Sequence, residues 1–204
     1  MNKQFKKIIY VVLAVGAVFA VATVSVNIFL KNKLERFVNE RLPENMVRSY
    51  DEISVESFGG SLSITNASLI IKNKKDSVAH TYINVEKLKI SHISYWDYIF
   101  NDEIHVETIS LENPIMAYYK DRVVTNEDSI RKGIFKIYKP ITVEKVKINN
   151  SKFAIYEKGK DSTRVYTKGL SVEVGGIEIN DKTIRRKIPA TFKNYSAESD
   201  TVFV

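Results

Sequence analysis

A repeated strand pattern constrains the fold of this chain more than any other feature of its sequence. If h is an apolar residue, the pattern h-x-h-x-x-h-x-h starts at Leu62, Ile83, Ile104 and Ile141. The alternation turns one face of a strand toward an apolar environment, and the two central x residues break its phase. We expect a β-bulge at each break, which keeps the apolar residues on one side while it bends the sheet.

The repeats predict one shared apolar face. Its expected members are Leu62, Ile64, Leu69, Val85, Leu88, Ile90, Val106, Ile109, Leu111, Val143, Val146 and Ile148. A weaker copy starts at Val165, and a partial copy comprises Ile53, Val55, Phe58 and Gly60. Either the face lines an open groove, or it forms a closed hydrophobic core. The pattern alone favours neither.

Turn signals separate the strands. They are Gly59-Gly60, the polar loop 73–77, Asn101-Asp102, Asn113-Pro114, Asn149-Asn150-Ser151, residues 158–161 and residues 180–182. Connections this short favour an antiparallel meander, which the repeated phase breaks would curve. The longer gap over 119–140 could hold a short helix or an excursion over the surface. The competing interpretation is a β-sandwich of two sheets. Gly175-Gly176 indicates a further bulge or turn.

An uncharged apolar segment precedes the strands. Residues 8–30 are long enough to cross a membrane as a helix, and basic residues flank both ends. Anchor positions in this segment are Ile8, Val12, Phe19, Ile28 and Leu30. A cleaved signal peptide is the alternative, because Ala20-Val21-Ala22 resembles a cleavage site. The apolar run continues beyond that site, which favours an uncleaved transmembrane helix.

The segment divides the chain into four parts. Residues 1–7 form a basic stub that we expect in the cytoplasm, and residues 8–30 form the transmembrane helix. An amphipathic juxtamembrane helix is predicted over 31–48, with Pro43 ending it. Residues 50–204 form the repeated-strand β-domain outside the cytoplasm.

The sequence holds no recognisable set of catalytic or metal-binding residues. Cysteine is absent, and His80, His92 and His105 lack zinc-motif spacing. No nucleotide-binding or hydrolase motif occurs. The net charge is +7, but the lysines of the β-domain are scattered, so we expect no nucleic-acid binding. The prediction is a protein that is not an enzyme and uses neither a cofactor nor a metal.

One aromatic cluster spans Tyr95-Trp96-Asp97-Tyr98-Ile99-Phe100. Tryptophan and tyrosine favour the boundary between membrane and water, so the cluster could lie there or cap the groove. The alternative is a plug in the core between strands.

Three segments resemble the N-terminal part of AsmA-like proteins of Gram-negative bacteria. Residues 55–64 (VESFGGSLSI) are similar to the first strand, glycine turn and second strand of that family. Residues 85–90 (VEKLKI), followed by Tyr98-Ile99-Phe100, and residues 104–115 (IHVETISLENPI) resemble its later strands. The resemblance implies a chorein-like, taco-shaped β-groove. It also implies an inner-membrane anchor, a periplasmic domain, and passage of phospholipid acyl chains toward the outer membrane.

The chain differs from that family in length, because AsmA-like proteins are usually much longer. At about 4.8 Å per strand, about ten strands would extend a sheet only about 50 Å. Residues 201–204 (TVFV) also look like the middle of a strand, so we expect a truncated chain or a short member that needs partners. The alternative function is an anchored scaffold that binds another envelope protein without lipid, or a jelly-roll link similar to LptC.

Overall fold

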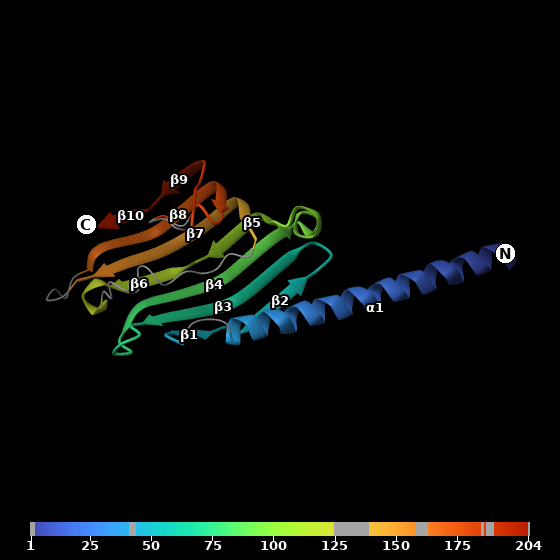
Figure 1. Ribbon diagram of the computed structural model, residues 1–204, viewed down its shortest axis with the longest axis horizontal. Coiled ribbons are helices and arrows are strands. Elements are labelled where there is room, and N and C mark those ends of the chain that lie inside the picture. The colour runs from blue at the N-terminus through green and yellow to red at the C-terminus, as the bar shows by residue number, and fades with distance from the viewer. Residues whose placement is uncertain are drawn as a thin grey trace.

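The computed structural model describes residues 3–40, 44–124, 139–157, 163–184, 186 and 190–203. They form one long helix, α1 (Lys3–Glu40), beside a single ten-stranded sheet (Figure 1). The strands are β1 (Met46–Ser49), β2 (Glu52–Glu56), β3 (Ser61–Lys72), β4 (Ala79–Ile93), β5 (Ile104–Glu112), β6 (Ile115–Tyr119), β7 (Ile141–Tyr156), β8 (Thr163–Ile179), β9 (Asn194–Glu198) and β10 (Thr201–Phe203). Two short helical turns are η1 (Asp97–Asn101) and η2 (Lys120–Arg122).

Helix α1 unites the predicted membrane segment and the predicted juxtamembrane helix without interruption. It is long and apolar enough to span a membrane. The predicted helix end at residue 48 is wrong, because α1 ends at Glu40 and residues 46–49 form β1. Strand β1 alternates half-buried and exposed residues and pairs with the second half of β3. Pairing with a sheet edge therefore outweighs the helical spacing of the preceding residues.

Side-chain hydrogen bonds attach α1 to the β-domain at two separate levels. The Asn39 side chain donates a hydrogen bond to the Tyr50 hydroxyl at 3.3 Å, and the backbone N–H of Ser57 donates to Asn27 Oδ1 at 2.7 Å. Twelve residues separate Asn27 and Asn39, which is about 18 Å along the helix axis. Helix α1 also packs on β2, and Ile53 in that strand is only 1% exposed.

The ten strands occupy seven positions across the sheet. Strands β1 and β2 both pair with β3, strands β5 and β6 both lie between β4 and β7, and strands β9 and β10 both pair with β8. Six strand spacings make the sheet about 29 Å wide, well below the 50 Å expected for ten strands side by side. Since Figure 1 shows one continuous sheet, the alternative of two facing sheets is also wrong.

The sheet is mixed, so the prediction of a wholly antiparallel meander is wrong. Strands β5 and β6 run parallel to β7, while the other pairs are antiparallel. A parallel neighbour needs a connection that returns along the whole strand. Just before β7, Pro140 lies beside the start of β5, where the Ile104 N–H donates to the Pro140 carbonyl at 2.8 Å. The predicted helix or excursion there falls largely on residues 125–138, outside the described residues.

A first line of interrupted pairing crosses the sheet, starting from the predicted phase breaks of β3 and β4. Between the pairs Thr65↔Lys87 and Ala67↔Val85, the opposed residues Asn66 and Glu86 are absent from the ladder. Asn66, Asn113 and Asn150 adopt left-handed backbone conformations, with φ of 49°, 50° and 53°. Asn113 Nδ2 donates to Glu86 Oε2, and Asn150 Nδ2 donates to Asn113 Oδ1, each at 2.6 Å. We call this line, through Asn66, Glu86, Asn113 and Asn150, the first crease.

A second crease runs through His92, Glu107, Glu144 and Gly176, on β4, β5, β7 and β8. His92 and Gly176 have φ of 56° and 64°, and His92 Nδ1 lies 2.8 Å from Glu107 Oε2. At Asn66 and Glu86, at His92 and Glu107, and at Glu144 and Gly176, each strand has one unpaired residue. The register is unchanged there, so the predicted β-bulge is wrong at these three pairs.

At Asn150 in the first crease the register does shift, between Ile148 and Ser151. The predicted break at Asn149-Asn150-Ser151 lies inside β7, and Gly175-Gly176 lies inside β8. By contrast, the predicted turns at Gly59-Gly60 and 73–77 are confirmed, because they connect the antiparallel pairs β2–β3 and β3–β4.

Candidate functional site

One face of the sheet carries apolar side chains at every strand position. Residues paired directly across neighbouring strands point to the same face. The first row, followed through the pairings, is Val55, Leu62, Ile90, Ile109, Val146, Val174 and Tyr195. The second row is Ile53, Ile64, Leu88, Leu111, Ile148, Val172 and Ala197. These two rows cross all seven strand positions without a polar residue.

Further rows extend this apolar face on both sides. Leu69, Ile83, Met116 and Phe153 are paired across β3, β4, β6 and β7. At the other end, Val106, Val143 and Ile177 are paired across β5, β7 and β8. The structure therefore brings together on one face the predicted positions that these rows contain. Each crease adds one residue to the alternation, so the apolar residues before and after it point to the same face.

The opposite face between the same two rows is polar. Its row consists of Ser54, Ser63, Lys89, Ser110, Lys147, Glu173 and Ser196. Glu173 forms ion pairs with Lys145 at 3.2 Å and Lys147 at 3.9 Å. Adjacent rows thus differ completely in polarity, and a shift of one residue in any strand would mix the two faces.

The apolar face is only partly withdrawn from solvent. Of the twelve predicted positions, Val85, Val106 and Val143 are buried, and the other nine are half-buried. The buried hydrophobic core of the described residues comprises only those three valines with Ile53 and Ala154. A filled interior would bury most of the rows, so the closed-core interpretation does not fit these exposures.

A second apolar surface lies at the end of the sheet nearest the N-terminal half of α1. It consists of Phe58 in the β2–β3 turn and Trp96, Tyr98, Ile99 and Phe100 around η1, and we call it the tip. Phe58, Trp96 and Phe100 are 79%, 74% and 69% exposed. Trp96 and Phe100 stack on each other with ring centroids 5.2 Å apart. The alternative of a core plug for this cluster is therefore wrong.

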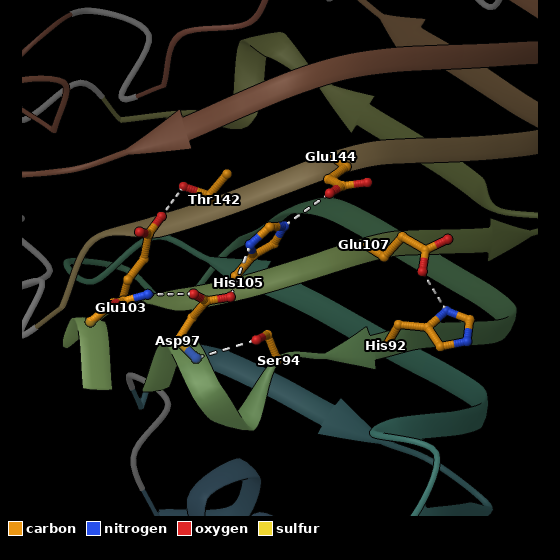
Figure 2. A network of polar contacts seen from close by, with 9 residues as sticks. His92, Ser94, Asp97, Glu103, His105, Glu107, Thr142 and Glu144 are labelled. Carbon is orange, nitrogen blue, oxygen red and sulfur yellow. Dashed lines mark hydrogen bonds and ion pairs between the residues drawn. The ribbon is translucent and has the colours of Figure 1, made fainter. Parts of the chain in front are cut away.

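A polar network fixes η1 against the sheet (Figure 2). His105 on β5 lies between two carboxylates, with Nδ1 3.2 Å from Asp97 Oδ2 and Nε2 3.1 Å from Glu144 Oε1. Hydrogen bonding to Ser94 and Asn101, with the nearby His105, lowers the pKa of Asp97. Glu103 adds a hydrogen bond from its N–H to the Asp97 carbonyl at 3.2 Å, and it accepts one from Thr142 on β7.

The His105 ring separates the two carboxylates of the network. They contact opposite nitrogens of the ring, so they do not converge on a common point. Within the described ranges, no group of three or more histidine, cysteine, aspartate or glutamate residues is arranged to hold a metal ion. The chemistry that this region supports is positioning of η1.

The anchor positions lie along α1. Phe19 and Ile28 are exposed and Leu30 is half-buried, while Ile8 and Val12 lie in the N-terminal part of the same helix. Phe19, Thr23 and Leu30 face the β2–β3 turn across an apolar crevice of about 400 Å³, which Phe58 and Tyr95 close from the other side.

Sequence reasoning missed part of the apolar face. Val172 belonged to the weaker copy that starts at Val165, whereas Val174, Tyr195 and Ala197 follow no repeat. The partial copy placed Phe58 in a strand, but Phe58 lies in the turn. No protein-family profile matches the chain, and no curated protein matches it significantly.

Proposed function

We propose that this chain is a single-pass, membrane-anchored protein whose apolar sheet face binds phospholipid acyl chains. The observation that supports this function is the pair of apolar rows, which are half-buried across the central strands and hold no polar residue across seven strand positions. A resemblance to AsmA-like proteins gives the same expectation for the anchor, the curved strands and the lipid.

The binding energy follows from the hydrophobic effect. Each CH₂ group removed from water contributes about 0.8 kcal/mol, so an acyl chain on the face gains stability in proportion to its covered length. Hydrophobic burial has no preferred direction, and successive rows present similar side chains. A chain can therefore move along the face without crossing a large barrier, which suits transport better than tight storage.

The membrane arrangement is part of the proposal. The helix crosses the bacterial inner membrane, its basic N-terminal stub stays in the cytoplasm, and the sheet stands in the periplasm. A short basic stub before the first apolar helix is typical of this orientation, since long C-terminal domains translocate largely regardless of their charge. In this place the protein would contribute to lipid homeostasis of the envelope and outer membrane.

Site-specific photo-crosslinking tests the lipid proposal on the full chain in its membrane. A photoreactive phenylalanine analogue, benzoylphenylalanine, replaces Ile109 or Ile148 on the apolar face. Its matched controls replace Ser110 and Lys147, the neighbours that point to the polar face. We expect phospholipid adducts, identified by mass spectrometry, at Ile109 and Ile148 and not at the controls.

Two results would contradict the proposal. Equal lipid adducts on both faces would show contact with the membrane in general and no selective binding. Adducts from Ile109 and Ile148 to another envelope protein, without lipid, would favour the scaffold.

A further inference from the structure

We propose that the tip inserts into the bilayer beside α1 and seats the end of the sheet in the leaflet that faces the β-domain. This inference rests on the membrane-anchor part of the proposed function and not on lipid binding by the apolar face. The ligand of the tip is the hydrocarbon and interfacial region of a lipid bilayer.

The contacts with α1 set the level of the tip. Ser57 N–H donates to Asn27 Oδ1, and the ring of Phe58 packs edge-on against Phe19 with centroids 5.9 Å apart. Both helix residues belong to the uncharged segment 8–30. If that segment crosses the membrane, the β2–β3 turn lies at a depth where α1 itself is surrounded by hydrocarbon.

Several backbone groups of the turn have partners that suit that environment. In a bilayer, backbone N–H and C=O groups need partners within the protein. Ser57 N–H is bonded to Asn27, while its carbonyl accepts hydrogen bonds from Gly60 N–H at 3.3 Å and the Tyr95 hydroxyl at 2.7 Å. The Gly60 carbonyl accepts from Ile93 N–H at 2.9 Å. Asn27, a polar residue in an apolar helix, thereby gains a partner as well.

The composition around η1 fits the boundary between lipid and water. Trp96 and Tyr98 are residue types enriched at this boundary, and Ile99 and Phe100 extend outward beside them. Lys139 lies next to them, donating to the Tyr98 carbonyl at 3.0 Å and pairing with Asp102 at 2.9 Å.

The polar network on β5 and β7 keeps the exposed apolar residues fixed outward. Asp97, the first residue of η1, is held by His105, and the Asn101 side chain donates to Asp97 Oδ1 at 2.7 Å. A protein partner could also cover an exposed aromatic surface. The position directly beside an apolar helix, with which the tip shares a crevice, favours the bilayer instead.

Trp96 is the only tryptophan in the chain, so its fluorescence reports the position of the tip directly. The full chain is reconstituted into phosphatidylcholine–phosphatidylglycerol vesicles, with or without lipids brominated at defined depths. We expect a blue-shifted emission that brominated acyl chains quench and that aqueous iodide leaves largely unquenched. In a Phe58→Trp, Trp96→Phe double variant, we expect the strongest quenching from more deeply brominated lipids.

Charge substitutions supply the matched control. Phe100→Asp should shift the Trp96 emission toward that of water-exposed tryptophan and increase quenching by iodide. Val78→Asp adds the same charge at an exposed apolar residue in the β3–β4 turn, at the opposite end of β3, and should change neither property. Circular dichroism confirms that each variant retains the sheet.

One set of results would overturn the inference. Trp96 would be quenched by iodide and unaffected by brominated lipid, although the protein stays in the vesicle fraction. The photo-crosslinking at Ile109 remains informative in that case, because it tests the apolar face and not the tip.

Discussion

The creases make a specific prediction about Asn150. Its φ of 53° is left-handed, a conformation that costs most residues about 1–2 kcal/mol and costs glycine almost nothing. Asn150→Gly loses the side-chain hydrogen bond to Asn113, which at an exposed position contributes about 0.5–1 kcal/mol. Asn150→Ala loses the same bond and adds the backbone cost, so we expect it to destabilise the protein by about 1.5–3 kcal/mol.

Thermal unfolding of the purified full chain in detergent, followed by circular dichroism, measures this difference. For a chain of 204 residues, the alanine variant should unfold about 2–8 °C below the glycine variant. The neighbouring Asn149 provides the control, since its φ is not positive and its side chain donates to Glu112 Oε1 at 2.8 Å. There the order should reverse, because glycine weakens an ordinary strand position by about 0.5–1 kcal/mol relative to alanine.

Equal stability of Asn150→Gly and Asn150→Ala would refute the reasoning. It would mean that the left-handed residues impose no constraint and that the creases do not specify the shape of the sheet.

Two further predictions concern the contacts that hold the helix and the tip. Ile53→Ala should lower the free energy of unfolding by about 2–4 kcal/mol in a denaturant titration, because Ile53 is the most deeply buried large side chain of the described residues. A smaller loss for Ile53→Ala than for the half-buried Val55→Ala would contradict this prediction. The lowered pKa of Asp97 stabilises the fold above the ordinary aspartate pKa, and this contribution is lost as the pH falls through the lower, folded-state value. Asp97→Asn should remove that acid-dependent part of the stability. An acid titration followed by the fluorescence of the neighbouring Trp96 measures this loss. An unchanged titration in the variant would show that Asp97 contributes nothing.

The apolar face could be predicted from the sequence because the alternation of apolar and polar residues lies within each strand. The repeats at Leu62, Ile83 and Ile104 each contain both halves of the pattern, and the phase break between them is visible in the residues themselves. Asn66, Glu86, Glu107 and Glu144 stand at those breaks, where the ladder is interrupted. One face per strand therefore follows from alternation alone.

The topology could not be predicted in the same way. The parallel pairing of β5 with β7 depends on the end of β5 at which β7 begins. The apolar periodicity of the strands contains no information about that position. Sharing of one position by β5 and β6 depends on the left-handed Asn113 before Pro114, a signal that also suits an ordinary turn. Asn149-Asn150 was equally ambiguous, since asparagine marks turns as well as left-handed residues inside strands.

The tip was visible in the sequence as an aromatic cluster, but its exposure was not. Whether Trp96 and Phe100 fill a core or point outward depends on His105 and Glu144, which come from other strands. Long-range contacts of this kind leave no mark on the local pattern.

The double attachment of α1, at Asn27 and at Asn39, has a mechanical consequence. Hydrogen bonds at two levels about 18 Å apart prevent the sheet from rotating about a single contact point, so helix and sheet should tilt as one rigid body. Transmembrane helices adjust their tilt to the thickness of the surrounding bilayer. Under the proposed membrane anchoring, a thinner or thicker bilayer would therefore change the angle at which the strands leave the lipid surface.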